Sequence, residues 1–168
     1  MKVFLIAAIT ADGFIAKNSD HLASWTSKED KQFFVEKTKE AGVVVMGFNT
    51  YKTIGRPLPG RLNIVYSKTE VNIPGIEVTQ EEPVKLIQNL AKRGYEQVAI
   101  TGGAQIYTMF MEAGLVDTLY LTVEPVVFGY GMSLFTKKLD NRLQLQSFEK
   151  IGDNSILLEY NVIHERLL

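Results

Sequence analysis

The residues with the clearest chemical potential lie in one short stretch, WTSKEDKQFF, at positions 25–34. Asp30 stands among charged residues, but Phe33 and Phe34 follow it by one helical turn, on either side. On a helix this spacing turns Asp30 toward the same face as the two rings, with Ala41 three turns further along nearly the same line. A carboxyl group in such surroundings loses hydration, which raises its pKa and makes it a candidate for handling a proton or for binding a cationic ligand.

The same stretch also has a purely structural interpretation. Thr26 or Ser27 can cap a helix, and Glu29 or Asp30, three residues later, would complete a capping box. Lys37 lies near the line of Asp30 two turns on, so we expect it at the rim of any pocket or in solvent. Periodicity favours the buried carboxyl, because an ordinary capping acid needs no apolar neighbours. Both interpretations stay open on these residues alone.

The elements that must position Asp30 follow an alternating pattern. Long apolar runs predict buried strands, and helix-period segments lie between them. The predicted strands are residues 3–9, 42–47, 62–67 and 97–103, and the predicted helices are residues 27–40, 49–54, 81–95 and 104–114. This alternation is typical of an α/β fold with a mostly parallel central sheet flanked by helices.

The last third of the chain has a different pattern. Residues 117–128, 143–153 and 155–168 are predicted strands with no comparable helix between them. Gly152, Asp153 and Asn154 supply a turn between the final two, so we expect an antiparallel C-terminal hairpin at the edge of the sheet. We find no linker or repeat, and we expect one domain over residues 1–168.

Composition excludes several classes of function. The net charge of -1 gives no basic surface for nucleic acid, and no apolar run approaches the ~20 residues of a membrane-spanning helix. The absence of cysteine excludes disulfides and thiolate nucleophiles, which fits a cytoplasmic protein. His21 and His164 are far apart in the sequence, so we expect no metal site.

In the order and spacing of its motifs, the chain resembles the dihydrofolate reductase family. The matching segments are FLIAAITADGFIA at 4–16, Trp25, Asp30 and Phe34, VVVMGFNTYKTIGRPLPGRLNIVYS at 43–67, AITGGAQIY at 99–107, and LYLTVEP at 119–125. The resemblance implies a single-domain dihydrofolate-reductase-like fold. It also implies a reductase that passes a hydride from NADPH to the pterin ring of dihydrofolate.

The resemblance implies roles for individual residues at the substrate. Asp30 would anchor the pterin and promote its protonation, supported by Thr122 and by Trp25. The other implied substrate-binding residues are Ile6, Ala8, Phe34, Ile54 and Arg61. Independently of the family, the prolines and glycine of GRPLPGR stiffen a loop that presents Arg61, and arginine suits a bidentate grip on a carboxylate. We expect Arg61 to bind the glutamate carboxylate of the substrate, and Arg56 to be solvated.

The segments MGFNT and TGGA stand at strand-to-helix junctions, where free backbone N–H groups favour phosphate and glycines permit close approach. With the resemblance, they become the two ends of an NADPH groove, with Thr50 at the pyrophosphate. The implied cofactor residues are Ala8, Ile15, Gly47, Asn49, Thr50, Ser67, Lys68, Gly102, Gly103, Ala104, Gln105, Ile106 and Tyr107. Phe48 and Gln105 stand where the family usually has cations, so we expect a weaker preference for NADPH over NADH.

The segment TADGFIAKNSDHLASW, residues 10–25, has the length and polarity of a lid over an active site. Two other functions stay open. TADGFIA and PVVFGYGMSLF also resemble the riboflavin-pathway reductase domains, which share the fold and take a ribosylaminopyrimidine phosphate. The other is a nucleotide-binding protein without catalysis, against which the joint presence of Asp30, Arg61 and Thr122 counts. The sequence leaves monomer and homodimer equally open.

Overall fold

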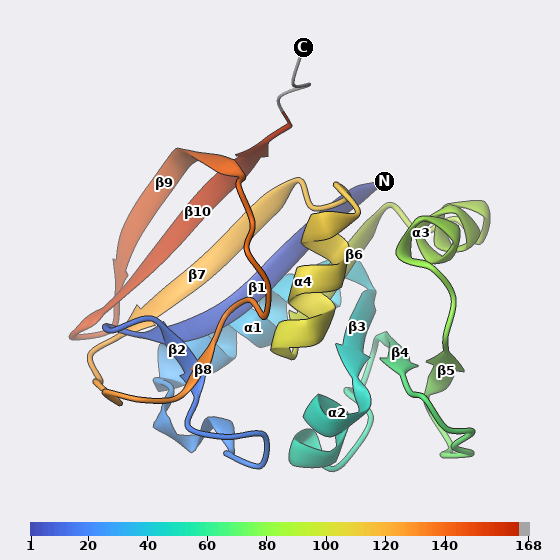
Figure 1. Ribbon diagram of the computed structural model, residues 1–168, viewed down its shortest axis with the longest axis horizontal. Coiled ribbons are helices and arrows are strands. Elements are labelled where there is room, and N and C mark those ends of the chain that lie inside the picture. The colour runs from blue at the N-terminus through green and yellow to red at the C-terminus, as the bar shows by residue number, and fades with distance from the viewer. Residues whose placement is uncertain (165–168) are drawn as a thin grey trace.

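The computed structural model describes residues 1–164 and contains a twisted central sheet with helices on both faces (Figure 1). The eight strands of the sheet lie in the order β5-β4-β3-β6-β1-β7-β10-β9. Their bounds are β1 (Lys2–Thr10), β3 (Val43–Gly47), β4 (Leu62–Tyr66), β5 (Glu77–Thr79), β6 (Gln97–Gly102), β7 (Thr118–Glu124), β9 (Arg142–Ile151) and β10 (Ser155–Ile163).

The six neighbouring strands β5, β4, β3, β6, β1 and β7 pair in parallel. β10 runs antiparallel to β7, and β9 runs antiparallel to β10. The predicted α/β class, the mostly parallel sheet and the antiparallel hairpin at its edge are therefore confirmed. Residues 165–168 of the predicted final strand lie outside the described residues.

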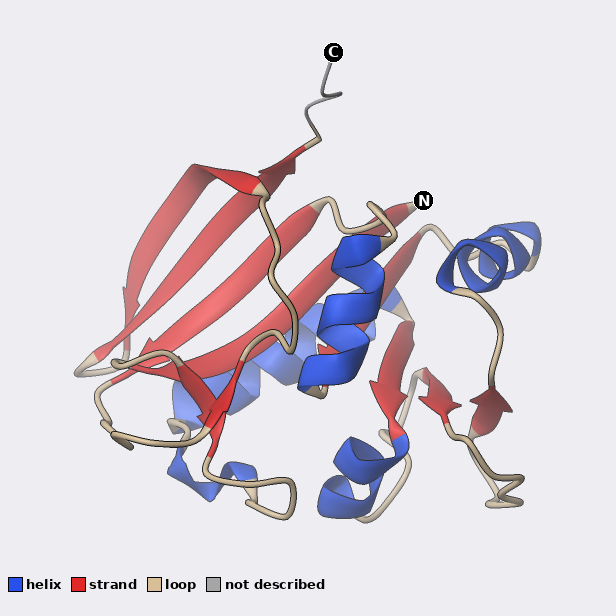
Figure 2. Ribbon diagram, viewed as in Figure 1, coloured by secondary structure: helices blue, strands red, loops and turns tan. Residues whose placement is uncertain are grey.

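Helices cover the sheet from two sides. They are α1 (Lys28–Ala41), α2 (Phe48–Ile54), α3 (Pro83–Lys92) and α4 (Ala104–Glu112), with a short 3-10 turn η1 (Ala23–Trp25) before α1. In Figures 1 and 2, α4 crosses in front of the sheet and α1 lies behind it. Successive β1 residues divide between these layers. Leu5 packs in the core under α3 and α4, and Phe4 and Ile6 pack in the core under α1 and α2.

This two-sided burial explains the apolar runs, because both faces of a central parallel strand need apolar side chains. Phe4 and Leu5 are both fully buried although they point in opposite directions. The C-terminal hairpin differs, since β9 is exposed along nearly its whole length. Its mixed polar and apolar sequence reflects an edge strand without a covering layer.

Several boundaries differ from the prediction for local reasons. The predicted helix 81–95 begins at Pro83, a residue well suited to the first helical position, and ends at Lys92. The predicted strand 117–128 ends at Glu124, because Pro125 has no N–H to donate to a neighbouring strand.

Three short strands were not predicted. β5 adds to β4 at the sheet edge. β2 (Phe14–Ala16), inside the segment predicted as a lid, pairs with β8 (Met132–Ser133) from much later in the chain. Strands of three residues or fewer are too short for an alternating pattern to identify them.

Candidate active site

A cavity of about 1200 Å³ opens at the carboxyl ends of the parallel strands. This is where ligands bind in open α/β sheets, since the loops that follow the strands diverge there. The cavity wall contains every residue that the sequence analysis assigned to substrate, cofactor or catalysis except Thr122 and Arg61. We call the part around Asp30 the acid end, and the part around Gly47, Gly102 and Gly103 the glycine end.

Asp30 lies in the cavity wall with only 9% of its surface exposed. Burial is the largest effect on its carboxyl group and raises the pKa, and the neighbouring Glu124 raises it further. Hydrogen bonds with the side chains of Thr122 and Thr26, and the charge of Lys31, act in the opposite direction, so that the net pKa shift is upward. The carboxyl group is therefore held where a proton or a cationic ligand would stabilise it.

The helical face predicted for Asp30 is the buried face. Ala41 is buried, and Phe33 and Phe34 both pack against the core under α1. The two rings differ in role, since Phe34 lines the cavity whereas Phe33 packs edge-on against Tyr120, with 5.6 Å between ring centroids. Only Phe34 therefore walls the Asp30 carboxyl on the cavity side.

The capping interpretation is also correct in part. Ser27 caps α1, because its Oγ accepts a hydrogen bond from the Asp30 backbone N–H at 3.1 Å. The reciprocal half of a capping box is made by another residue, since the Ser27 N–H donates to Glu124 Oε1 at 2.8 Å. The Asp30 backbone thus belongs to the cap, while its side chain faces the cavity.

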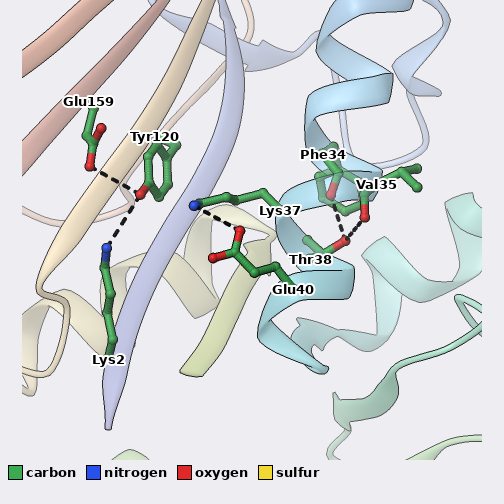
Figure 3. Close-up of polar contacts among 8 residues, drawn as sticks. All are labelled: Lys2, Phe34, Val35, Lys37, Thr38, Glu40, Tyr120 and Glu159. Carbon is green, nitrogen blue, oxygen red and sulfur yellow. Dashed lines mark hydrogen bonds and ion pairs between the residues drawn. The ribbon is translucent and has the colours of Figure 1, made fainter. Parts of the chain in front are cut away.

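Lys37 lies outside the cavity wall and does not neutralise Asp30. Its Nζ lies 3.2 Å from Glu40 Oε2 and 5.2 Å from the centroid of the Tyr120 ring, as the close-up in Figure 3 shows for the Glu40 pair. Lys31 is the lysine of α1 that lines the cavity, and its Nζ donates to the Thr26 carbonyl at 2.9 Å.

Thr122 is 1% exposed and lies on β7 opposite Ala8 of β1. It is behind the wall rather than in it, and it reaches the site through its hydrogen bond with the Asp30 carboxyl. Glu124 stands two residues further along β7 and was not predicted. A usable signal existed, because residues two apart on a strand share a face, and an acid in the otherwise apolar run LYLTVEP is unusual.

Arg61 does not line the cavity. Its Nη1 donates to Thr38 Oγ1 at 2.7 Å and its Nε donates to the Pro59 carbonyl at 3.1 Å. Thr38 in turn donates to the carbonyl of Phe34 at 2.6 Å, one turn nearer the acid end (Figure 3). Asn63 fixes the loop, accepting from the Leu58 N–H and donating to the carbonyls of Leu58 and Arg61. The arginine is held beside α1, next to the residues that form the wall.

The glycine end brings two strand-to-helix junctions together. A Cβ on Gly103 would lie 3.3 Å from Thr50 Oγ1, and a Cβ on Gly47 would lie 3.2 Å from Ile106 Cγ1. Gly102 has a φ of +121°, and a Cβ there would lie 3.2 Å from Tyr107 Oη. Side chains at these positions would fill the space where the junctions approach, so the cavity and its glycines fit an extended dinucleotide.

Tyr107 links the two ends of the cavity. Its hydroxyl donates to the Ile6 carbonyl at 2.8 Å, which ties α4 to β1 at the cavity wall. Burial raises the pKa of this phenol well above its usual range, and the charge of Asp30 adds to the effect. The tyrosine therefore acts here as a neutral hydrogen-bond donor.

The side chains expected near a 2′-phosphate lie at the far part of the glycine end. Lys68 and Phe48 both line the cavity, and the Phe48 ring stacks on Tyr51. The Ser67 hydroxyl donates to the Thr69 carbonyl at 2.9 Å. Glu81 and Glu82 also line the cavity and were not predicted, because residues 81–95 were expected to form one helix.

The segment predicted as a lid is fastened to residues 125–131. Asp12 accepts hydrogen bonds from the backbone N–H groups of Phe128 and Gly129. Trp25 and His21 both pack edge-on against the Phe128 ring, at 5.2 and 5.4 Å between centroids. Since Ile15, His21 and Trp25 line the cavity, this segment forms one of its walls.

Residues 1–164 show neither a metal centre nor a membrane span. That part of the chain holds no group of three or more acidic or histidine side chains placed to bind a metal ion. It also contains no helix with the length and hydropathy of a membrane span.

The fold and site define a class of α/β protein, in which a ligand crevice at the carboxyl ends of parallel strands contains a buried acid. The family model described as dihydrofolate reductase matches residues 2–142, and the chain belongs to that family. It is 36% identical to dihydrofolate reductase type 3 of Salmonella typhimurium, over 73% of this chain and 71% of the relative. It is 34% identical to dihydrofolate reductase of Bacillus subtilis, over 71% and 67%.

Two solved structures with a similar fold have other descriptions. Acinetobacter baumannii RibD superposes with a TM-score of 0.86 at 18% identity, covering 97% of this chain and 58% of that chain. A pyrimidine reductase-like protein from Corynebacterium diphtheriae superposes with a TM-score of 0.79 at 18% identity, covering 98% and 92%. At these identities the similarity establishes the fold alone.

Proposed function

We propose that this protein reduces 7,8-dihydrofolate to 5,6,7,8-tetrahydrofolate with NADPH as the hydride donor. The observation that carries the proposal is the buried carboxyl of Asp30 in the wall of a large, mostly apolar cavity, beside Thr122 and Phe34. Membership of the dihydrofolate reductase family supports it, as does the relatives' description as dihydrofolate reductases.

The Asp30 carboxylate would bind the amino group of the pterin and the ring nitrogen next to it. A planar heterocycle with paired N–H donors matches the two oxygens of a carboxylate, and the apolar surroundings strengthen each hydrogen bond. Because burial raises its pKa, the Asp30 carboxyl favours a protonated ring beside it. Asp30 would thereby increase the basicity of the substrate, and the proton itself would come from water.

The other residues at the acid end would align the ring. Phe34 lines the wall and offers a flat apolar surface for stacking, and Ile54 and Ile6 line the wall with it. Thr122 would hold the Asp30 carboxyl in one orientation through the hydrogen bond already present. Catalysis would then depend on alignment in a dry cavity rather than on an unusual side chain.

The glycine end would hold the cofactor. NADPH, when bound, supplies the hydride. Gly47, Gly102 and Gly103 line the cavity and let its two strand-to-helix junctions approach each other, with Thr50 of α2 beside Gly103. Lys68 lines the cavity where the 2′-phosphate is expected, whereas Phe48 and Gln105 stand where the family usually has cations. NADPH should therefore have a lower KM than NADH, but the difference should be smaller than is usual in the family.

Arg61 would bind the carboxylate of the glutamate portion of the substrate. The hydrogen bonds from its Nη1 to Thr38 and from its Nε to the Pro59 carbonyl fix the guanidinium group beside α1. A carboxylate arriving there would meet a cation that has already lost much of its conformational freedom.

A second candidate substrate is a ribosylaminopyrimidine phosphate, which the riboflavin-pathway reductases take. The similar folds of the RibD protein and the pyrimidine reductase-like protein favour this alternative. It requires a cationic site for the ribose phosphate, and it assigns no role to Arg61.

One assay separates the candidates. NADPH oxidation by the purified protein is followed by absorbance with dihydrofolate, with the aminopyrimidine phosphate, and with neither. We expect turnover on the order of 1–100 per second with dihydrofolate alone. Turnover only with the pyrimidine would establish the second candidate. Binding of NADPH without turnover on either substrate would establish a protein without catalysis.

A further inference from the structure

Glu124 is a buried acid for which the proposed function gives no role. It is 2% exposed, on β7, two residues beyond Thr122 and on the same face of the strand. A buried carboxyl group is costly unless donors surround it. The hydrogen bonds that Glu124 accepts indicate its structural role.

Three hydrogen bonds converge on the Glu124 carboxyl. Ser27 donates to Oε1 through both its N–H and its Oγ, each at 2.8 Å, and Ser155 Oγ donates to Oε2 at 2.6 Å. The carboxyl group accepts all three hydrogen bonds from two serines, an arrangement that suits its ionised form. Ser27 is the N-cap of α1 and Ser155 is the first residue of β10. Glu124 therefore joins β7, the start of α1 and the start of β10.

The contact with Ser27 also decides the orientation of Asp30. In an ordinary capping box, the acid at the third helical position turns back to accept from the N-cap N–H, and here that acid is Asp30. Glu124 has taken this N–H instead. The Asp30 side chain is thereby released from the cap and faces the cavity.

Glu124 also acts on Asp30 through charge. Like charges disfavour each other's ionised form, and the negative charge of Glu124 raises the pKa of the Asp30 carboxyl. The other charged or titratable groups around Asp30 are Lys31 on α1, which lowers its pKa, and Tyr107 on α4, which is neutral. Among these neighbours, Glu124 is the carboxyl group whose negative charge raises the pKa of Asp30.

We propose that Glu124 is a positioning residue for Asp30, replacing it in the helix cap and placing a second acidic group beside it. This inference rests on the proposed function only in assigning Asp30 to the pterin. The arrangement itself belongs to the protein without any ligand.

The test uses Glu124→Gln, which keeps the shape and an acceptor for Ser27 but removes the charge. Asp30 is titrated by carbon NMR of side-chain carboxyl groups in the ligand-free protein, with its signal identified by its loss in Asp30→Asn. We expect the Asp30 midpoint to fall by about one pH unit in Glu124→Gln. The pH profile of kcat for dihydrofolate should shift in the same direction.

Two matched variants separate charge from packing. Ser155→Ala removes one hydrogen bond to Glu124 but leaves the charge, so the Asp30 midpoint should stay within about 0.2 units of wild type. Glu159→Gln removes a carboxylate elsewhere on β10, where it accepts from Tyr120 and Ser147, and it should leave the midpoint unchanged.

An unchanged Asp30 midpoint in a folded Glu124→Gln protein would overturn the inference, as would equal shifts in all three variants. The NMR result needs no substrate. If the midpoint shifts but dihydrofolate is not turned over, the inference stands and the proposed function fails. If Glu124→Gln does not fold, Glu124→Thr, which also removes the charge and suits a β-strand, is titrated instead. The Asp30 midpoint should fall by about the same amount in that variant, and an unchanged midpoint would count against the inference.

Discussion

The acid end and the glycine end of the cavity are built from different parts of the chain. At the acid end, side chains determine the chemistry, because Asp30 on α1 bonds Thr122 on β7, and Glu124 on β7 bonds Ser27 at the start of α1. At the glycine end, the absence of side chains matters, since Gly47 and Gly103 leave the backbone open where two junctions approach. A change of one atom should therefore affect the acid end through charge and the glycine end through volume.

The largest effect should follow from changing Asp30. Asp30→Asn keeps the shape of the site but removes the ionisable group, so kcat/KM with dihydrofolate at neutral pH should fall by about 100-fold or more. Activity should recover in part at acid pH, where the substrate arrives already protonated. Steady-state kinetics from pH 5 to 9 measures both effects.

Glu29→Gln is the matched control for this variant. Glu29 neighbours Asp30 in sequence, but its carboxyl lies against the hairpin turn, within 2.9 Å of where a Cβ on Gly152 would stand. Its kcat/KM should stay within about twofold of wild type. Equal kcat/KM in Asp30→Asn and wild type would remove the pterin role of Asp30.

A smaller effect should follow from adding one methyl group at the glycine end. Gly102→Ala places a Cβ 3.2 Å from Tyr107 Oη at a φ of +121°, so both space and backbone oppose it. We expect the Kd for NADPH to rise by about tenfold, because the junction must shift where the dinucleotide approaches. Quenching of the Trp25 fluorescence by NADPH measures this Kd without substrate.

Gly114→Ala controls for backbone strain. Gly114 also has a positive φ, +65°, but nothing lies within 4 Å of a Cβ there. It should lose about 1 kcal/mol of stability and keep the wild-type Kd. Equal loss of NADPH affinity in both variants would show that strain, rather than the volume at Gly102, is responsible.

The smallest effect concerns stability and pH. The pKa of Asp30 is raised in the folded protein above its ordinary value of 3.8, so the folded state binds the proton more tightly than the unfolded state. The contribution of Asp30 to stability is therefore greatest below pH 3.8 and is lost as pH rises through the folded pKa. The Asp30→Asn variant has no carboxyl group at this position, so it does not lose stability in this way as the pH rises. Each unit of pKa shift corresponds to about 1.4 kcal/mol.

Urea unfolding at several pH values between 4 and 8 tests this expectation. The stability of Asp30→Asn relative to wild type should increase with pH over that window. A difference that stays constant from pH 4 to 8 would show that the Asp30 carboxyl is not destabilised by burial.

Much of the site was predictable from local pattern. The face of α1 that carries Asp30 and Ala41 follows from helical periodicity, which needs no knowledge of the partner layer. The glycines at the ends of β3 and β6 follow from strand-to-helix junctions in the same way. The parallel sheet and the C-terminal hairpin were also predicted correctly, because buried strands and the Gly152 turn have distinct compositions.

Short elements and long-range partners were less predictable. β5 has only three residues, so it carries no periodic pattern. Arg61 was predicted to bind the substrate carboxylate, and this stays a prediction. Arg61 does not line the cavity, and its Nη1 donates to Thr38 on α1. That contact joins residues 23 positions apart, so no local pattern in the sequence predicts it.

The sequence by itself predicted a buried acid at position 30 and glycines at the two strand-to-helix junctions, and the structure places both in the cavity wall. Only the tertiary structure decided what surrounds them, since Thr122 meets Asp30 and Glu124 meets Ser27 across 97 residues of sequence. Helical and strand periodicities act over a few residues, whereas the order β6-β1-β7-β10 arises from burying several strands at once. The orientation of Asp30 is therefore a property of the assembled sheet.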